Sequence, residues 1–552
     1  MTPVLGERVQ VEVDVPATPL RPFLKFSTAV ETRRPVPRAR VKFRVSVVSD
    51  GFPVIAHEGT VRFKGHNRWR HHWVDLAAWA GKRVTLAFET RPTSSGGDVP
   101  WADRIRAVWG DPVVGAREAQ ESAGRSPSVI LIVIDALRYD YLGVNGFRGE
   151  VSPNLDWLAL ESVRFENAVA AAPWTKPSIA TIFTGLHPET HGVLRLHRNS
   201  GEALSERAVT LAEVFREHGY RTAGFVGNAL LSPPYGFQQG FETYLVDRRG
   251  DVLLDELRSW LSADGDAPYF VYLHLIGAHG PYRAPEADYR LLRASPSLGA
   301  VRKILPTDPP RPDHLEMTPF ATVDEGGRLE AWKAKYAAAV RAVDRRLGVL
   351  LNELRRSGDL DRSLVVLTSD HGEEFLEHPS WEHGYELCSH QLHVPLWFRL
   401  PGAVGAGARA TQVVSLVDLM PTLLGFSGLP APKRSQGEDR SGWVTDPSSR
   451  DGPGIAFASG MLGKPEIHSM WTDRYRFEWN SKTGVSRLFD RKLDPAETND
   501  VAELHPDLVA RLKERLLEHL AEISEAGTLE PEMRGIPEDI REELRALGYV
   551  QD

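Results

Sequence analysis

The chain has 552 residues, 42% of them hydrophobic and 25% charged, and its formal net charge of −8 at pH 7 is mild for this length. Such a composition is ordinary for a globular protein of two or three compact units, and the absence of a basic stripe argues against a nucleic-acid partner. The longest strongly apolar run, "VILIVI" at 129–134, is far shorter than the ~20 residues of a membrane span, so no transmembrane segment is expected.

The N-terminus, "MTPVLGERVQVEVDVP", has neither the basic nor the apolar region of a signal peptide. As given, the sequence therefore predicts a cytoplasmic protein, or an extracytoplasmic one if the N-terminus is truncated. Cys388 is the only cysteine, so no internal disulfide can form.

Residues 1–114 alternate polar and apolar in short runs such as "RVKFRVSVV" and "KRVTLAFET". This pattern predicts a jelly-roll-like β-sandwich, followed by a polar linker at 115–127. Trp69, Trp73 and Trp79 resemble the aromatic platform of a carbohydrate-binding module. Tryptophans of this kind also fill sandwich cores, and we favour that interpretation.

From residue 128 the chain changes to α/β. Strand-like runs that are apolar throughout alternate with helical patterns, which indicates strands covered by helices on both faces. One helix is marked by apolar residues at spacings of three and four: Trp332, Tyr336, Val340, Val343, Leu347 and Leu350. We expect a catalytic domain at 128–429 and a smaller α+β subdomain at 430–552, with short strands and an amphipathic helix near 505–522.

Polar residues follow the buried strands. "VILIVI" ends at Asp135, "TAGFVG" at Asn228 and "SLVVLTS" at Asp370 and His371, while "FVYLHLIGA" runs into His279. Ligands of open α/β sheets bind outside the carboxyl ends of the strands. These residues therefore predict one functional site at that edge of the sheet rather than unrelated polar positions.

Two carboxylates and an imidazole, Asp135, Asp370 and His371, form a plausible set for one divalent cation. The imidazole favours Zn²⁺ or Mn²⁺ over Ca²⁺ or Mg²⁺. The hydroxyl of Thr175, which precedes the helical pattern of "KPSIATIFTG", would supply a fourth ligand. Threonine is also a common helix N-cap, so a cap and a metal-activated nucleophile both remain open, and the two roles are compatible.

In this order the motifs "VILIVIDALRYDYLGVNGF", "APWTKPSIATIFTG", "LHLIGAHGPY", "LTSDHGEEFLEH" and "HVPLWFRLPG" resemble the sulfatase family of the alkaline phosphatase superfamily. The resemblance covers 128–552 and implies a mixed sheet between helices with a small C-terminal subdomain. It implies that Asp135, Asp370 and His371 bind metal and that Thr175 attacks the ester. His279, and His383 of the downstream "HG", would contact the ester oxygens or the leaving group.

The chain departs from the family at the nucleophile. Sulfatases that convert a Cys or Ser to formylglycine carry that residue followed by x-Pro-x-Arg, whereas this chain reads Thr175-Lys176-Pro177-Ser178-Ile179. Ala136 also stands where many sulfatases have a second metal aspartate. These departures disfavour the formylglycine mechanism. A threonine nucleophile with two aspartates and a histidine around one metal instead resembles the phosphoethanolamine transferases and lipoteichoic acid synthases of the superfamily.

Because this chain lacks the membrane spans of those transferases, water is the expected acceptor. We expect hydrolysis of phosphate mono- or diesters through a phospho-threonine intermediate. Lys176 either adds positive charge beside Thr175 or is a solvated residue at the start of a helix. The alternatives are a sulfate-ester hydrolase that does not use formylglycine and a carbohydrate-binding protein with little catalytic activity. No Gly-x-Ser-x-Gly or His-Glu-x-x-His motif supports other hydrolase classes.

Overall fold

The structure is a computed structural model of the chain. It describes residues 8–17, 20–32, 40–49, 52–62, 70–92, 105–118, 126–197, 200–262, 267–294, 328–400, 405–449, 454–463, 466–547 and 549.

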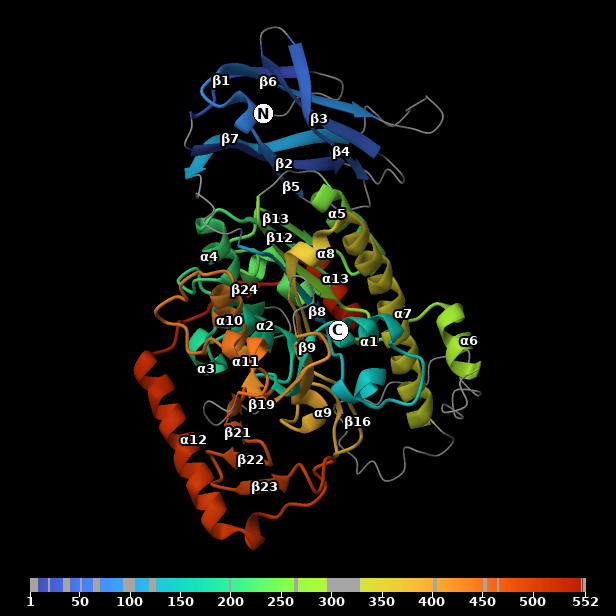
Figure 1. The fold of residues 1–552 in the computed structure, drawn as a ribbon, viewed down its shortest axis with the longest axis vertical. Helices are drawn as coiled ribbons and strands as arrows, with labels where there is room; N and C mark the ends of the chain where they lie inside the picture. The colour runs from blue at the N-terminus through green and yellow to red at the C-terminus, as the bar shows by residue number, and fades with distance from the viewer. Residues whose placement is uncertain are drawn as a thin grey trace.

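A large mixed sheet forms the centre of the molecule (Figure 1), as the sequence predicts. Its strand order is β13-β12-β14-β8-β15-β18-β9-β19. The first five strands are mutually parallel, whereas β18 is antiparallel to both of its neighbours. The strands are β8 (Ser128–Ile134), β9 (Val163–Val169), β12 (Arg221–Val226), β13 (Thr243–Val246), β14 (Tyr269–Leu275), β15 (Ser363–Thr368), β18 (His393–Arg399) and β19 (Arg409–Ser415).

Helices cover both faces of this sheet because its strands are apolar on both sides. In β8, Val129, Leu131 and Val133 belong to one hydrophobic cluster, and Ile130, Ile132 and Ile134 to another. The first cluster includes α2 (Thr175–Thr184), α4 (Leu211–Glu217) and α10 (Leu419–Phe426). The second includes α1 (Pro153–Leu160), α5 (Gly250–Ser262) and α7 (Arg328–Ser357), and α7 confirms the helix predicted between Trp332 and Leu350.

The N-terminal strands form two antiparallel sheets, ordered β1-β6-β3-β4 and β5-β2-β7. One hydrophobic cluster joins them: the ring of Trp109 in β7 lies 5.1 Å from Phe43 and 5.0 Å from Phe88 of the other sheet. The strands are β1 (Arg8–Asp14), β2 (Leu20–Thr32), β3 (Arg40–Ser49), β4 (Phe52–Arg62), β5 (Arg70–Asp75), β6 (Arg83–Pro92) and β7 (Ile105–Glu118). Strand β7 thus extends to Glu118, into the segment expected to be a linker.

The three tryptophans of the proposed sugar platform are only partly described. Trp79 is half-buried and packs against the core shared by the two N-terminal sheets, which matches the core interpretation. Trp69 and the side chain of Trp73 lie outside the described residues.

The C-terminal region contains a four-stranded antiparallel sheet and a long helix packed on it. The sheet consists of β20 (Ala456–Ala458), β21 (Ile467–Trp471), β22 (Tyr475–Asn480) and β23 (Ser486–Asp490), and the helix is α12 (Pro506–Ala526). The sequence predicts all of these except β21. The chain then returns to the catalytic region, where β24 (Glu532–Gly535) pairs with β11 (Ser200–Ala203) and α13 (Glu538–Leu547) follows.

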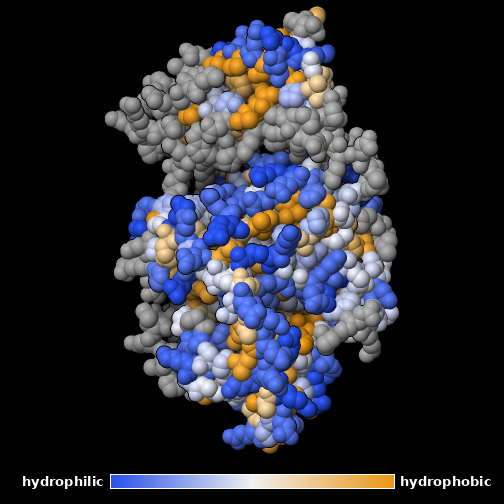
Figure 2. All heavy atoms as spheres, turned by 90° about the vertical axis from the view of Figure 1, so that its left-hand side faces the viewer, coloured by the Kyte–Doolittle hydropathy of each residue, from blue (hydrophilic) through white to orange (hydrophobic). Residues whose placement is uncertain are grey.

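The remaining helices and strands are short. They are β10 (Leu196–His197), β16 (Glu374–Phe375), β17 (Trp381–Glu382), α3 (Pro188–His191), α6 (Glu286–Ala294), α8 (Asp359–Arg362), α9 (Ser389–Leu392) and α11 (Ser441–Thr445). None of the helices within the described ranges combines the length and the apolar composition that a bilayer span requires. On the face shown in Figure 2, hydrophilic side chains predominate and hydrophobic ones form separate areas.

Two buried histidines, His519 in α12 and its neighbour His187, predict that the folded protein loses stability at acidic pH. The ring of His519 stacks on Phe457 at a centroid distance of 3.6 Å, and burial together with the neighbouring His187 lowers the pKa of His519 to about 3. The unfolded state takes up a proton near pH 6.5 that the folded state does not, so stability falls as the pH drops below that value. Between pH 6.5 and 5.5 this group should account for about 1 kcal/mol.

His519→Phe keeps an aromatic ring that can stack on Phe457 and removes the titratable imidazole. Urea unfolding measures the free energy of unfolding at pH 6.5 and at pH 5.5. Between these two values the variant should lose about 1 kcal/mol less of this free energy than the wild type. His505→Gln, at an exposed histidine before the same helix, is the control and should not change the pH dependence. Equal pH dependence in wild type and His519→Phe would contradict the assignment.

Candidate active site

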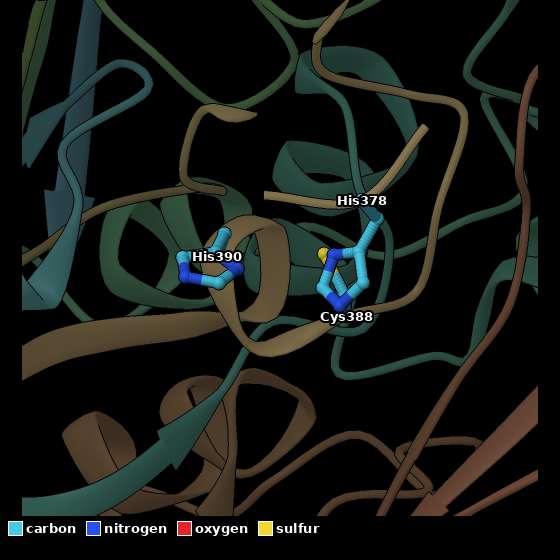
Figure 3. Close-up of side chains that lie close together, drawn as sticks. All are labelled: His378, Cys388 and His390. Atoms are coloured by element: carbon cyan, nitrogen blue, oxygen red, sulfur yellow. The ribbon is translucent and has the colours of Figure 1, made fainter. Parts of the chain in front are cut away.

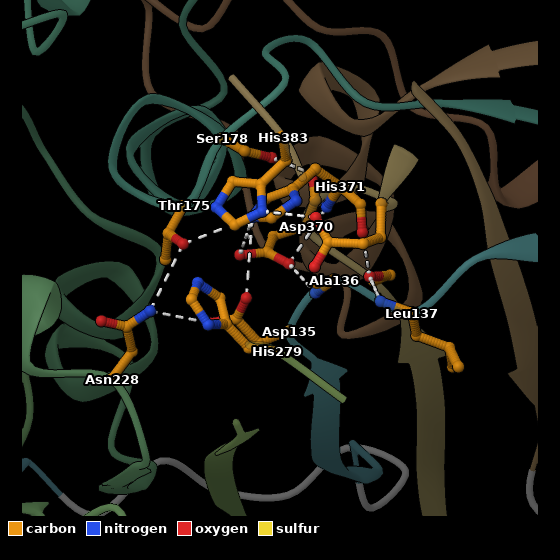
Figure 4. Close-up of polar contacts among 12 residues, drawn as sticks. Asp135, Ala136, Leu137, Thr175, Ser178, Asn228, His279, Asp370, His371 and His383 are labelled. Atoms are coloured by element: carbon orange, nitrogen blue, oxygen red, sulfur yellow. Dashed lines mark hydrogen bonds and ion pairs between the residues drawn. The ribbon is translucent and has the colours of Figure 1, made fainter. Parts of the chain in front are cut away.

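The sheet brings the predicted residues to one edge. Strands β12, β14, β8 and β15 are neighbours and parallel, so their carboxyl ends lie side by side. Asp135 follows β8, Asn228 follows β12, His279 follows β14, and Asp370 and His371 follow β15. Figure 4 shows these side chains converging with Thr175 at the start of α2.

Asp135, Asp370, His371 and Thr175 form a compact, fully buried group. His371 Nε2 lies 3.6 Å from a carboxylate oxygen of each aspartate and 3.3 Å from Thr175 Oγ1. Ligands about 2.1 Å from a tetrahedral ion are about 3.4 Å apart, so these separations suit a cation held between the four groups.

The two carboxylates support this interpretation independently. Asp135 Oδ1 and Asp370 Oδ2 are buried and have no hydrogen-bond partner among the described residues. Buried carboxylate oxygens are rarely left without a partner, because the loss of solvation is costly. The same two oxygens are the ones that face His371, so the residues present fit a divalent cation.

The electrostatics of the pair also favour a cation. Burial opposes ionisation of Asp135, but His279 and His274 more than offset it and hold the pKa of this carboxyl well below its usual range. Burial and the charge of Asp135 raise the pKa of Asp370 well above its usual range. Two buried carboxylates this close can both ionise only with added positive charge, which a divalent ion supplies.

Serine side chains hold the ligand-bearing turns in place. Ser369 Oγ lies 2.6 Å from the carbonyl oxygens of both Ile134 and His371, which ties the end of β15 to the end of β8. Ser178 Oγ, one turn into α2, donates to the carbonyl of Asp370 at 2.6 Å. These bonds fix the register between the aspartates and the helix that carries Thr175.

Ala136 has a left-handed backbone conformation, with φ of 58°. This conformation costs energy for a residue with a Cβ and is found mostly at functional sites. Its N–H donates to Asp370 Oδ1 at 3.2 Å, and its carbonyl accepts from Tyr336 Oη at 2.7 Å. The turn after β8 is therefore held so that one backbone N–H contacts an expected metal ligand.

Thr175 is not the N-cap of α2. The capping position belongs to Trp174, whose side chain makes no capping bond, and Thr175 is the first helical residue. Its hydroxyl lies 3.3 Å from His371 Nε2 and accepts from Asn228 Nδ2 at 3.3 Å. The same amide also donates to Asp135 Oδ2 at 2.7 Å. The cap interpretation is wrong, and the hydroxyl contacts the candidate metal site instead.

His279 and His383 lie beside this group (Figure 4), with ring centroids 4.8 Å apart. The ring of His383 is also 4.3 Å from that of His371. His383 Nδ1 is 2.9 Å from Glu373 Oε1, so the carboxylate orients the ring. The structure thus places both predicted histidines next to the candidate metal-binding group.

Lys176 does not take part in this group. Its ammonium donates to the carbonyl of Glu202 and lies 4.0 Å from the ring centroid of Tyr235 in η6 (Pro233–Tyr235). Burial lowers the pKa of Lys176 to about 7. The side chain is fully buried, so the solvated lysine of the sequence analysis is wrong, and the ammonium contacts Glu202 rather than Thr175.

Three contributors were not predicted. His274 lies inside β14 and places Nε2 2.9 Å from Asp135 Oδ2. Glu373 orients His383, and its only sequence signal is its position two residues after His371. Tyr549, in the last four residues of the chain, places its hydroxyl 3.3 Å from Thr175 Oγ1, and no motif marks it.

A second group of metal-binding residue types, His378, Cys388 and His390, lies near α9 (Figure 3). His378 Nδ1 is 3.0 Å from Glu374 Oε1 and its Nε2 is 3.2 Å from the carbonyl of Glu497, so both ring nitrogens donate. Burial works against the charged ring, but Glu374 raises the pKa of His378 above its usual range. This histidine is an ion-pair partner of Glu374 rather than a metal ligand.

Comparison with known proteins identifies the family of the chain. The sulfatase family model matches residues 127–429, and the model of the C-terminal region of N-sulphoglucosamine sulphohydrolase matches 381–524. An ulvan-active sulfatase of Formosa agariphila is 24% identical over 452 residues, which covers 72% of this chain and 83% of that protein. An arylsulfatase of Clostridium perfringens is 26% identical over 478 residues, which covers 71% of this chain and 94% of that protein.

Among solved structures, the phosphonate monoester hydrolase of Agrobacterium radiobacter superposes with a TM-score of 0.57 at 22% identity, covering 72% of this chain and 96% of that one. This likeness concerns the fold. The family match spans more than half of the chain, and it includes the edge of the sheet where the candidate residues meet. The chain therefore belongs to the sulfatase family.

Proposed function

We propose that this protein is a metal-dependent hydrolase of sulfate esters that uses the unmodified hydroxyl of Thr175 as its nucleophile. The observation that carries the proposal is the position of Thr175 Oγ1, 3.3 Å from His371 Nε2 and beside two carboxylate oxygens without partners. The names of the relatives favour sulfate esters, and the comparisons do not support the preference for phosphate esters drawn from the sequence.

Asp135, Asp370, His371 and Thr175 would hold the cation. The imidazole favours Zn²⁺ or Mn²⁺, whereas Ca²⁺ or Mg²⁺ would rely on the two carboxylates. When bound, the ion would lower the pKa of the Thr175 hydroxyl and withdraw charge from the ester oxygens.

The residues of the chain then divide the reaction between them. Thr175 loses its hydroxyl proton to water, its Oγ forms a bond to the ester sulfur, and the bond from sulfur to the alcohol oxygen breaks. Asn228 Nδ2 donates to Thr175 Oγ1 and so favours its deprotonated form. The hydrogen-bonded pair of Glu373 and His383 supplies the proton that the leaving alcohol requires. Water then cleaves the threonine sulfate and releases inorganic sulfate.

A second candidate is hydrolysis of phosphate esters, and Thr175 itself favours it. A formylglycine hydrate can expel sulfate by breaking its own C–O bond, but a threonine sulfate must be cleaved by water at sulfur. A threonine phosphate is cleaved in the same manner at phosphorus, as expected for an in-line phosphoryl transfer site. The polar site formed by Asp135, Asp370, His371 and Thr175 suits the tetrahedral group of either ester.

A substrate panel separates the two candidates. We expect kcat/KM for 4-nitrophenyl sulfate to exceed that for 4-nitrophenyl phosphate and bis(4-nitrophenyl) phosphate at equal metal content, measured by metal analysis of the same preparation. Higher kcat/KM on either phosphate ester would select the second candidate. Turnover of none of the three would contradict both.

We also propose the domain division expected from the sequence, with the first boundary moved to the end of β7: a β-sandwich at 1–118, a linker at 119–127, a catalytic domain at 128–429 and a subdomain at 430–552, from which β24 and α13 return to the catalytic domain. The two N-terminal sheets that share one core support the first unit. The sheet of β20–β23 with its own hydrophobic cluster against α12 supports the last. Carbohydrate binding by the N-terminal unit is a weaker proposal, because Trp79 packs against its core.

A further inference from the structure

The C-terminal segment contributes one side chain to the candidate active site. The hydroxyl of Tyr549 lies 2.7 Å from His279 Nε2, 3.3 Å from His383 Nε2 and 3.3 Å from Thr175 Oγ1. A single hydroxyl is therefore within hydrogen-bond range of the expected nucleophile and of both histidines. At neutral pH a phenol carries its proton and can donate one hydrogen bond.

Both histidines place a ring nitrogen within hydrogen-bond distance of this hydroxyl. His279 Nδ1 is 2.5 Å from the carbonyl of Gly280, and His383 Nδ1 is 2.9 Å from Glu373 Oε1. Because His279 Nδ1 donates to the carbonyl, the neutral form of this ring directs the lone pair of Nε2 toward Tyr549. His383 offers its Nε2 lone pair in the tautomer whose Nδ1 donates to Glu373. One phenol hydrogen can satisfy only one acceptor at a time. The donor can therefore turn from one acceptor to another when an anion enters.

The segment that carries Tyr549 is anchored in the fold. Strand β24 pairs with β11 along its whole length, and Ile536 and Leu544 are buried in the main hydrophobic cluster. The N–H of Tyr549 donates to the carbonyl of Leu544 at 3.0 Å, which fixes the residue against the end of α13. A plug that leaves when substrate binds would need a looser attachment, so these contacts favour a permanent part of the site.

We propose that Tyr549 is a catalytic residue whose phenol donates a hydrogen bond to a non-bridging oxygen of the ester group attacked by Thr175. In an in-line displacement the leaving oxygen lies on the far side of the central atom from the nucleophile. A donor beside Thr175 Oγ1 therefore meets the equatorial oxygens, on which charge accumulates in the transition state. This role rests on the proposed function, and no covalent bond to Tyr549 forms.

The test compares Tyr549→Phe with the wild type at equal metal content. The variant keeps the ring and its packing and removes only the hydroxyl. Calorimetric titration with inorganic sulfate should give a dissociation constant about tenfold higher than in the wild type, and kcat/KM on the active ester should fall about 10- to 100-fold. Tyr475→Phe, at a half-buried tyrosine of β22, is the control and should change neither quantity.

Truncation provides a second, independent comparison. A chain that ends at residue 550 keeps Tyr549 and should bind sulfate like the wild type, whereas a chain that ends at residue 548 should bind it about tenfold more weakly. Unchanged or tighter sulfate binding by Tyr549→Phe and by the shorter chain would overturn the proposal, and tighter binding would identify the tyrosine as a plug. Absence of ester turnover in the wild type would instead contradict the proposed function, because the sulfate titration does not depend on turnover.

Discussion

Thr175→Ala is expected to lower kcat by at least about 10³-fold, because the variant lacks the atom that attacks the ester. The methyl group of alanine fits the space of the threonine, and the helix is anchored by Ser178 rather than by Thr175. The variant should therefore remain folded, and with Asp135, Asp370 and His371 intact it should still bind metal. Steady-state kinetics and metal analysis of the same preparation measure both effects.

Two variants serve as controls for this experiment. Thr184→Ala removes a hydroxyl from the last residue of the same helix and should leave kcat within a few-fold. Among the described residues this hydroxyl bonds to backbone atoms of α2 and the following turn. Thr175→Ser keeps the nucleophilic oxygen and should retain much more activity than Thr175→Ala. Equal kcat in wild type and Thr175→Ala would show that the hydroxyl does not react.

Asp370→Asn is expected to abolish both metal binding and activity without destabilising the metal-free protein. In the absence of metal, burial and the charge of Asp135 raise the pKa of Asp370, so the amide replaces a carboxyl group that is already protonated. The wild type should gain about 3 kcal/mol of stability when the metal concentration is 100 times its dissociation constant, and the variant should gain almost none. Thermal unfolding with EDTA and with added metal measures this difference.

Asp361→Asn is the matched control for this change. Asp361 lies in α8, before the opposite end of β15, and its side chain is 65% exposed. This variant should keep the metal-dependent shift of the wild type. A metal-dependent shift that persists in Asp370→Asn, or that is absent from the wild type, would contradict the assignment of the metal site.

The location of the site could be predicted because strand ends are visible in the sequence. Asp135, Asn228 and Asp370 each follow a short, mostly apolar run, which is typical of a strand buried on both faces. Parallel neighbours place their carboxyl ends at one edge, so no side-chain geometry was required to bring these residues together. The mixed sheet is expected from the resemblance to the sulfatase family, and the covering helix α7 from apolar residues at spacings of three and four.

The contacts of individual side chains could not be predicted. Thr175 fits the composition of an N-cap, and only the structure shows that the cap is Trp174 and that the threonine hydroxyl faces His371. Lys176 stands next to the nucleophile in sequence, but a helix turns successive side chains by about 100°, and its ammonium reaches Glu202 instead. Tyr549 reaches the site only because β24 returns the chain to β11.

The choice between sulfate and phosphate esters depends on the motif and the relatives and not on the positions of the side chains. The motif around Thr175 departs from that of formylglycine sulfatases, and this departure led to the expectation of phosphate esters. Relatives over most of the catalytic region are named sulfatases, which favours the opposite choice. The two esters have the same tetrahedral shape, so the arrangement of Asp135, Asp370 and His371 does not distinguish them.

The most direct test of the nucleophile is to trap the enzyme during turnover. Acid quenching of the metal-loaded protein with its best ester, followed by peptide mass spectrometry, should find the sulfuryl or phosphoryl group of the substrate on Thr175, and Thr175→Ala should carry none. A wild type that turns over while the peptide containing Thr175 stays unmodified at every quench time, together with an active Thr175→Ala, would contradict the account.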